Sequence, residues 1–293
     1  LGRVWERRTV KVFVIPILWA CGLNSIKIVS CCESTTKVRP LRSGLERAKK
    51  IKARRDQLTG TQRCGRTCEN MRLRIEAILW ILRAGCPWRD LPPYFGSWKS
   101  VYDRFRAWTR SGLWSDLLVA ISAGSRDEEY VMIDSTAMRV HAHGANPAGG
   151  QIAQAMGRSK ASLSTKIHMA CDALGYPLGF ILTGANVSDF DQAKPLLRRY
   201  LQPRAHALMD KGYDSDAIRA YVNQLGAIAV IALHPNRSQK PAFDQHIYRE
   251  RHRIENLFAK LKQYRRIATR YEKLHSSFAA MVCIASILVW IKS

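Results

Sequence analysis

Two aspartates each follow a short apolar run that has the pattern of a buried strand. Asp134 comes after Tyr130-Val-Met-Ile133, and Asp210 comes after His206-Ala-Leu-Met209. Ligands of α/β sheets gather where strands end, so the two carboxylates meet if their strands are neighbours. Either aspartate alone is more ordinary as a turn or helix-cap residue. The pattern therefore needs a third member before it indicates chemistry.

A helix predicted over residues 246–264 supplies that third carboxylate. At 100° per residue, Tyr248, Arg251, Glu255 and Lys262 fall within about 60° of one another on the helix surface. The apolar residues occupy a separate arc, so the helix packs one face on the sheet and presents this polar edge beside it. The alternative is a solvated face with an Arg251–Glu255 ion pair, which contributes only about 0.2–0.5 kcal/mol.

Asp134, Asp210 and Glu255 together are suited to holding two divalent metal ions. Hard cations such as Mg²⁺, with Mn²⁺ as a substitute, prefer oxygen ligands. A pair of such ions activates an attacking oxygen and stabilises a leaving one. Three carboxylates that lie close together repel one another, which explains why cations such as Lys211, Arg251 and Lys262 would flank them.

The charge of the chain indicates a polyanionic partner. The 293 residues carry 47 Lys and Arg against 23 Asp and Glu, a formal net charge of +24. Lys and Arg neutralise phosphates and release counterions, so nucleic acid is favoured over a basic surface kept for solubility. With 47% hydrophobic residues, wholesale disorder is excluded. The chain contains no Walker loop and no dinucleotide fingerprint, so nucleotide hydrolysis and hydride transfer have no support.

The first part of the chain divides into two predicted regions. Residues 1–62 show little periodicity, and we expect an atypical basic segment that is disordered or frame-shifted. Residues 63–125 contain three short amphipathic helices with arginines on them, which is typical of a small helical DNA-binding domain. The alternative is a plain helical cap on the next domain.

Residues 128–293 change to the pattern β-β-β-α-β-α-β-α-α, which predicts an α/β domain with a mixed sheet flanked by helices. The segment 164–183 has the pattern of a hairpin. The apolar run 278–291 has 14 residues, whereas a membrane span needs about 20, so we expect a core helix and no membrane anchor. The eight cysteines are scattered, which indicates free thiols in a reducing cytosol.

Several motifs, taken together, resemble the DDE transposases of the IS5 insertion-sequence family. The resemblance covers residues 63–293, in order. Its motifs are Tyr248-x-x-Arg251-x-x-x-Glu255 with Lys262, Ile133-Asp-Ser-Thr136, Gly157-Arg158-Ser-Lys160, Ser164-Thr-Lys-Ile-His168, Asp210-Lys-Gly-Tyr-Asp214, Arg265-Arg-Ile-Ala-Thr-Arg-Tyr271 and Cys86-Pro-Trp-Arg-Asp-Leu-Pro92.

The resemblance implies an RNase H-like catalytic domain over residues 128–293 and a transposase that cleaves DNA strands and transfers them with Mg²⁺. It implies that Asp134, Asp210 and Glu255 are the catalytic and metal-binding triad. The expected DNA contacts are Tyr248, Arg251, Lys262, Lys211 and Arg158.

The partners that the resemblance implies are double-stranded DNA, as terminal inverted repeats and as target, and further copies of the chain on that DNA. The expected location is the bacterial cytoplasm, in association with the nucleoid. Two alternatives remain at this stage: a catalytically inactive DNA-binding remnant of a transposase, and a host nuclease on the same fold. Retention of all three carboxylates favours activity, whereas the atypical residues 1–62 favour decay.

Overall fold

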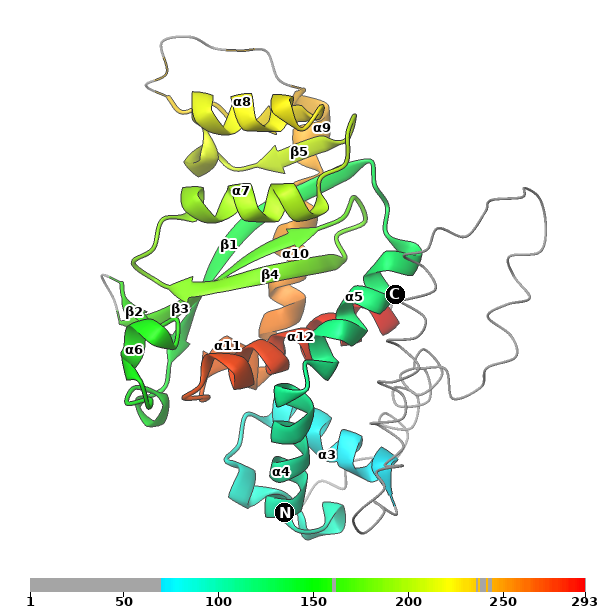
Figure 1. Cartoon of the computed structure of the whole chain (residues 1–293), viewed down its shortest axis with the longest axis vertical. Coiled ribbons are helices and arrows are strands. Elements are labelled where there is room, and N and C mark those ends of the chain that lie inside the picture. Colours follow the sequence, from blue (N-terminus) through cyan, green and yellow to red (C-terminus); the bar gives the residue numbers. More distant parts are fainter. Residues whose placement is uncertain (1–69, 160–161, 236, 238–240, 242–243, 293) are drawn as a thin grey trace, which may run out of the picture.

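A computed structural model describes residues 70–159, 162–235, 237, 241 and 244–292 (Figure 1). The predicted basic segment 1–62 lies outside the described residues. In the described part, helices cover both faces of a seven-stranded mixed sheet. The strands are β1 Tyr130–Val140, β2 Gly157–Arg158, β3 Leu163–Cys171, β4 Pro177–Gly184, β5 His206–Met209, β6 Ile228–Ile231 and β7 Thr269–Arg270.

The sheet has the order β2-β3-β1-β5-β6, with β4 paired to β3 and β7 paired to the end of β1. The strands β1, β5 and β6 are parallel, and β3 is antiparallel to both β1 and β4. Residues 131–133 and 207–209 are all buried, as expected for parallel strands covered on both faces. The predicted hairpin and the predicted mixed α/β sheet flanked by helices are confirmed.

Two crossover helices cover one face of the sheet, in front in Figure 1: α7 Asp189–Tyr200 and α8 Asp216–Gln224. Each begins at a serine whose hydroxyl accepts a hydrogen bond from a backbone N–H of the first turn, Ser188 from Phe190 and Ser215 from Ile218. The connections are shorter: η3 Ala142–Gly144, α6 Gly150–Ala153, η4 Lys211–Tyr213 and α9 Gln245–Arg249.

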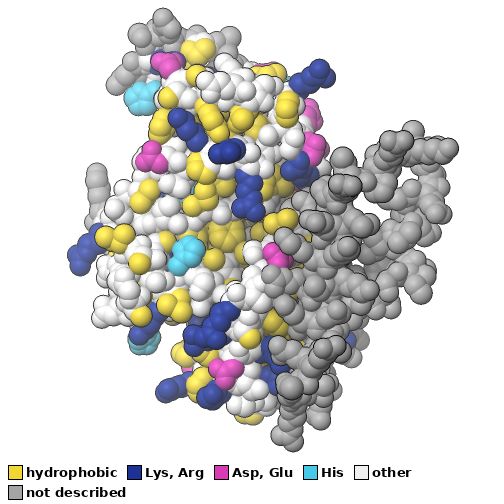
Figure 2. Space-filling model, viewed as in Figure 1, with side chains coloured by type: hydrophobic (Ala, Val, Ile, Leu, Met, Phe, Trp, Pro, Cys, Tyr) yellow, Lys and Arg dark blue, Asp and Glu magenta, His cyan; other side chains and the backbone are white. Residues whose placement is uncertain are grey.

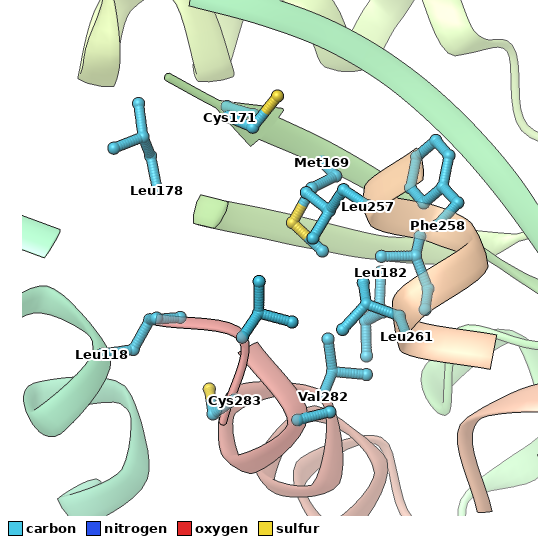
Figure 3. Close-up of a cluster of buried hydrophobic side chains, with 14 of the residues drawn as sticks. Leu118, Met169, Cys171, Leu178, Leu182, Leu257, Phe258, Leu261, Val282 and Cys283 are labelled. Carbon is cyan, nitrogen blue, oxygen red and sulfur yellow. The ribbon is translucent and has the colours of Figure 1, made fainter. Parts of the chain in front are cut away.

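The other face is covered by α10 His252–Lys262 and α12 His275–Ile291. Figure 3 shows leucines of α10 and Val282 of α12 packed with side chains of β3, β4 and α5. Twelve residues of α12 are buried, from Phe278 to Trp290, which confirms the predicted core helix. Within the described residues, no helix is long and apolar enough to cross a membrane.

The three predicted N-terminal helices are present as α3 Met71–Ala84, α4 Trp98–Arg110 and α5 Leu113–Ser125, with η1 Trp88–Asp90 and η2 Pro93–Phe95 between the first two. The helix α3 packs on α11 Arg265–Ala268, and α5 packs on α12. Their buried residues belong to the same hydrophobic core as those of the sheet. This packing fits the helical-cap alternative, and DNA binding by the unit remains a prediction.

Two predicted elements have different bounds. β1 does not end before Asp134, because β3 continues to pair with it as far as Arg139; only the parallel pairing with β5 ends, at Ile133 and Met209. The helix predicted over 246–264 is interrupted between α9 and α10, and α10 ends at Lys262. At the interruption, the backbone N–H groups of Glu250, Arg251, Arg253 and Ile254 bond carbonyls three residues earlier, so the turn is tighter than an α-helix.

Candidate active site

The predicted adjacency of the two aspartate-bearing strands is confirmed. Ile133 and Met209 form the last matched pair of β1 and β5, so Asp134 and Asp210 are the next residues on neighbouring parallel strands. Burial raises the pKa of the Asp134 carboxyl; the Ser135 N–H and Arg251 lower it, and Asp210 raises it again. The sheet therefore holds two carboxylates side by side at the point where β5 ends.

Arg251 connects this point of the sheet to the helix that carries Glu255. Its Nη1 donates to Asp134 Oδ2 at 2.7 Å, and its Nη2 donates to Glu255 Oε1 at 2.5 Å. Burial opposes the charge of the guanidinium, but Asp134 and its other anionic neighbours raise the Arg251 pKa above its ordinary value. One cation thus neutralises two carboxylates that are 121 residues apart in the sequence.

Tyr248 completes the group from α9. Its hydroxyl donates to Asp210 Oδ1 at 3.4 Å, and the Arg251 guanidinium lies over its ring at 6.0 Å from the centroid. Tyr248 and Arg251 therefore contact the aspartates directly, and Glu255 is joined to Asp134 through Arg251, even though the helix that was expected to align them is interrupted. The tight turn at Arg251 lets Tyr248 of α9 and Glu255 of α10 both bond residues of the candidate site.

The other predicted DNA-contacting residues do not contact the carboxylates of this group within the described structure. Lys262 is exposed at the end of α10, seven residues or about 10 Å along the axis from Glu255. Lys211 is exposed in η4, directly after Asp210. Arg158 is exposed on β2, at the edge of the sheet.

Sequence reasoning missed a set of polar contacts that join the sheet next to the site to α7. The buried His168 on β3 lies 2.7 Å from Thr183 Oγ1 through Nε2 and 3.5 Å from Asp189 Oδ1 through Nδ1. Lys166 donates to the same Asp189 oxygen at 2.9 Å. These contacts join two strands to the first turn of α7. The motif Ser164–His168 marks the strand residues, but no sequence pattern indicates Asp189 as their partner.

Asp214 is the second such residue, at the end of the motif that begins with Asp210. Its buried carboxylate accepts hydrogen bonds from the backbone N–H of His234, from Arg219 and from Arg237. Burial raises its pKa, but the hydrogen bonds and the two guanidinium groups together hold it below its ordinary value. The interaction anchors the turn that follows the candidate catalytic aspartate.

The donor set is chemically suited to a hard divalent cation, because Asp134 and Asp210 present carboxylate oxygens from adjacent strands. Within the described residues, no three His, Cys, Asp or Glu side chains are grouped as a metal site. The Arg251 guanidinium already occupies the position between Asp134 and Glu255. Joint metal ligation by all three carboxylates therefore requires that Arg251 release at least one of them.

Two family models match the chain. Residues 125–290 match the transposase DDE domain, and residues 51–118 match the putative transposase of the IS4/5 family. The chain belongs to the DDE transposase family. The first match contains all three candidate carboxylates, and the second contains α3 and α4.

Curated relatives agree with this family. Over 131 residues, 44% of this chain and the full length of the relative, the chain is 40% identical to a putative transposase for insertion sequence element IS6501 from Brucella ovis. Over 138 residues, 42% of this chain and 63% of the relative, it is 32% identical to a putative transposase for insertion sequence element IS402 from Burkholderia cepacia.

Solved structures that are similar include two transposase–DNA assemblies. One is the piggyBac transposase synaptic complex with hairpin DNA, with 11% identity and a TM-score of 0.45, covering 82% of this chain and 70% of that chain. Another is the Mos1 strand transfer complex, with 14% identity and a TM-score of 0.27, covering 90% of this chain and 99% of that chain.

Proposed function

We propose that this DDE transposase cleaves DNA at the ends of an insertion sequence and transfers the ends to a target, with Asp134, Asp210 and Glu255 as its catalytic carboxylates. The observation that supports the proposal is the placement of these three side chains: Asp134 and Asp210 directly follow matched residues of adjacent strands, and Glu255 is joined to Asp134 through Arg251. The partners are double-stranded terminal repeats and target DNA, bound by more than one copy of the chain.

The three carboxylates would hold two Mg²⁺ ions, or Mn²⁺ in their place. When bound, such ions supply activation of the attacking oxygen and stabilisation of the leaving oxygen. Tyr248 holds Asp210 through its hydroxyl, which limits the orientations open to that carboxylate. Asp134 is oriented by the Ser135 N–H at 2.8 Å. A backbone N–H thus orients Asp134, and the Tyr248 hydroxyl orients Asp210.

Arg251 has two successive roles in this proposal. Before DNA and metal bind, its guanidinium offsets the repulsion between Asp134 and Glu255. Once the carboxylates are neutralised by divalent cations, the same guanidinium would be available to bind a phosphate oxygen of the bound DNA strand. The exposed Lys211, Lys262 and Arg158 then bind the flanking backbone, which positions the DNA without reading its sequence.

Glu255→Gln tests the catalytic part of the proposal. The amide removes a ligand for hard cations and leaves every cation in place, so Mg²⁺-dependent cleavage of labelled element ends is lost while duplex binding is kept. The matched control is Glu250→Gln, which removes the same charge from the adjacent turn, where the carboxylate bonds Arg253 instead of the site. A Glu255→Gln protein that cleaves like the wild type contradicts the assignment.

The alternative is a DNA-binding remnant without catalysis. It is supported if the wild-type chain binds element ends but cleaves none of them with either Mg²⁺ or Mn²⁺. Cleavage without joining of the 3′ ends to a second duplex instead supports a nuclease on this fold.

Lys262→Ala tests the DNA-binding part. Lys262 is exposed and makes no hydrogen bond or ion pair with other described residues, so its removal leaves the melting temperature nearly unchanged. Loss of one phosphate contact weakens duplex binding and reduces the slope of log K against log salt by about one unit. Lys262→Arg should restore both. An unaltered slope in Lys262→Ala means that this residue does not contact DNA.

A further inference from the structure

A hollow of about 530 Å³ opens between α7 and α8, far from the candidate carboxylates. It is lined by three cations of α7, Lys194, Arg198 and Arg199, together with Pro195 and with Tyr221 of α8. Figure 2 shows this face of the molecule, with Lys and Arg side chains gathered around apolar surface over α7. The hollow is thus an apolar floor with a cationic rim.

The three cations lie on the outer side of α7. Ala193, Leu196 and Leu197 are buried and face the sheet, so the residues between and after them point outward. Within the described structure, none of the three cations forms an ion pair with a carboxylate, and two of them lie over aromatic rings. Lys194 lies 5.7 Å from the Tyr221 ring centroid, and Arg199 lies 5.4 Å from that of Tyr200.

Local structure accounts for only part of this arrangement. Arg198 and Arg199 lie in the last turn of α7, where the helix dipole favours positive charge by about 0.3–1 kcal/mol. That effect does not explain why Lys194, a full turn earlier, lines the same hollow. Some cations of this fold are paired across neighbouring elements, such as Lys166 with Asp189 and Arg219 with Asp214, but these three are not. Three like charges around one hollow make a surface suited to an external anion.

The hollow is separated from the candidate active site in two ways. The first turn of α7 adjoins η4, which follows Asp210 directly, but Arg198 is nine residues further on, about 14 Å along the helix. In addition, α7 and α8 lie in front of the sheet in Figure 1, whereas α10, which carries Glu255, lies behind it. A DNA strand bound at the carboxylates and an anion bound in the hollow would therefore lie on different sides of the sheet.

We propose that this hollow binds the phosphate backbone of a second stretch of duplex DNA, distinct from the stretch at the carboxylates. The inference rests on the proposed function, because it takes DNA as the partner. Lys and Arg neutralise phosphates, and the forked guanidinium groups of Arg198 and Arg199 match phosphate oxygens. Pro195 and Tyr221 supply an apolar surface for the sugars. Such contacts position DNA without reading its sequence.

The test measures binding of the full chain to a duplex of about four helical turns, over a range of salt concentrations and with EDTA present. Lys194→Ala, Arg198→Ala and Arg199→Ala are each expected to reduce the slope of log K against log salt by about one unit. The charge-matched control is Arg126→Ala, because Arg126 pairs with Glu128 beside the acidic residues Asp127 and Glu129. It should keep the wild-type slope.

A second measurement separates the hollow from the cleaved DNA. Mg²⁺-dependent cleavage of a short duplex that carries only one element end should be unchanged in the three variants. A matching loss of that cleavage would overturn the assignment to a second stretch. If the wild type binds duplex and all three variants keep its slope, this inference alone is wrong. If the wild type shows no salt-dependent duplex binding, both the proposed function and this inference are wrong.

Discussion

At the scale of single residues, Arg251 decides how the candidate active site is arranged without metal. Two of its nitrogen atoms bond carboxylates from a strand and from a helix, so one guanidinium holds both elements in register. In the proposed function, divalent cations from solution would compete with this guanidinium for the same carboxylate oxygens. The fold can therefore hold Asp134 and Glu255 against one guanidinium, which offsets their mutual repulsion.

His168 predicts how stability depends on pH. Burial lowers its pKa to about 4, against 6.5 for an ordinary histidine; Asp189 opposes this and Lys166 adds to it. Between pH 6.5 and 4 the unfolded chain binds a proton that the folded chain does not, so stability falls as pH falls, by about 2–3 kcal/mol over the window. Urea unfolding at pH 7, 5.5 and 4.5 measures this loss.

Substitution attributes the loss to this side chain. His168→Gln keeps a hydrogen-bonding group toward Thr183 but cannot be protonated, so its free energy of unfolding should vary less across the same window. His143→Gln is the control, because that side chain is exposed. Equal pH dependence in the wild type and in His168→Gln would contradict the prediction.

At the scale of elements, α11 joins the N-terminal helices to the C-terminal part of the chain. Arg266 is buried; it donates to Glu272 and to the carbonyl of Cys86, and its guanidinium lies 5.5 Å from the centroid of the Trp88 ring. Arg266→Met keeps the aliphatic part of the side chain but leaves the buried Glu272 carboxylate without its cation. This change should reduce the free energy of unfolding by about 3–5 kcal/mol.

The neighbouring arginine provides the comparison for that prediction. Arg265 belongs to the same short helix but is exposed, and its Cβ lies against Gly85, a contact that methionine preserves. Arg265→Met should therefore change the free energy of unfolding by less than about 0.5 kcal/mol. Denaturant curves of the two variants, recorded together, decide the matter: similar losses would mean that the buried ion pair does not hold the junction.

The strands and most helices could be predicted from the sequence because their signal is local. β5 has the bounds of the predicted run 206–209, since apolar runs reflect the burial of nearby residues. The break before α10 could not be predicted, because periodicity continues through it and the deciding contact joins Arg251 to Asp134, 117 residues away. Asp189 was missed for the same reason: its partners belong to another element.

At the scale of the whole molecule, opposite faces of the sheet carry different chemistry. The carboxylates meet between the sheet and α10, and the cationic hollow opens on the outer side of α7. If the carboxylates and the hollow bind DNA as proposed, one sheet holds both stretches of DNA in a fixed relation. This relation depends on the helical unit as well, because α5 packs against α12 and β4 behind the sheet.

The shared core predicts that the helical unit and the sheet unfold together. Five tryptophans lie in the N-terminal helices and their connections, namely Trp80, Trp88, Trp98, Trp108 and Trp114, whereas the strands belong to the other part. Tryptophan fluorescence and far-ultraviolet circular dichroism should therefore give coincident urea transitions. Two separate transitions would indicate that the helices form an independent domain.

A core variant at the junction makes this test stricter. Leu118 of α5 is 3% exposed and packs in the cluster that includes Val282 and Cys283 of α12 (Figure 3). Leu118→Ala should lower the free energy of unfolding by about 2–5 kcal/mol and shift both transitions equally, because one cavity weakens one common core. Leu174→Ala, at a leucine that is 51% exposed, should leave both midpoints nearly unchanged. If Leu118→Ala shifts the fluorescence transition alone, the helices and the sheet are stabilised separately.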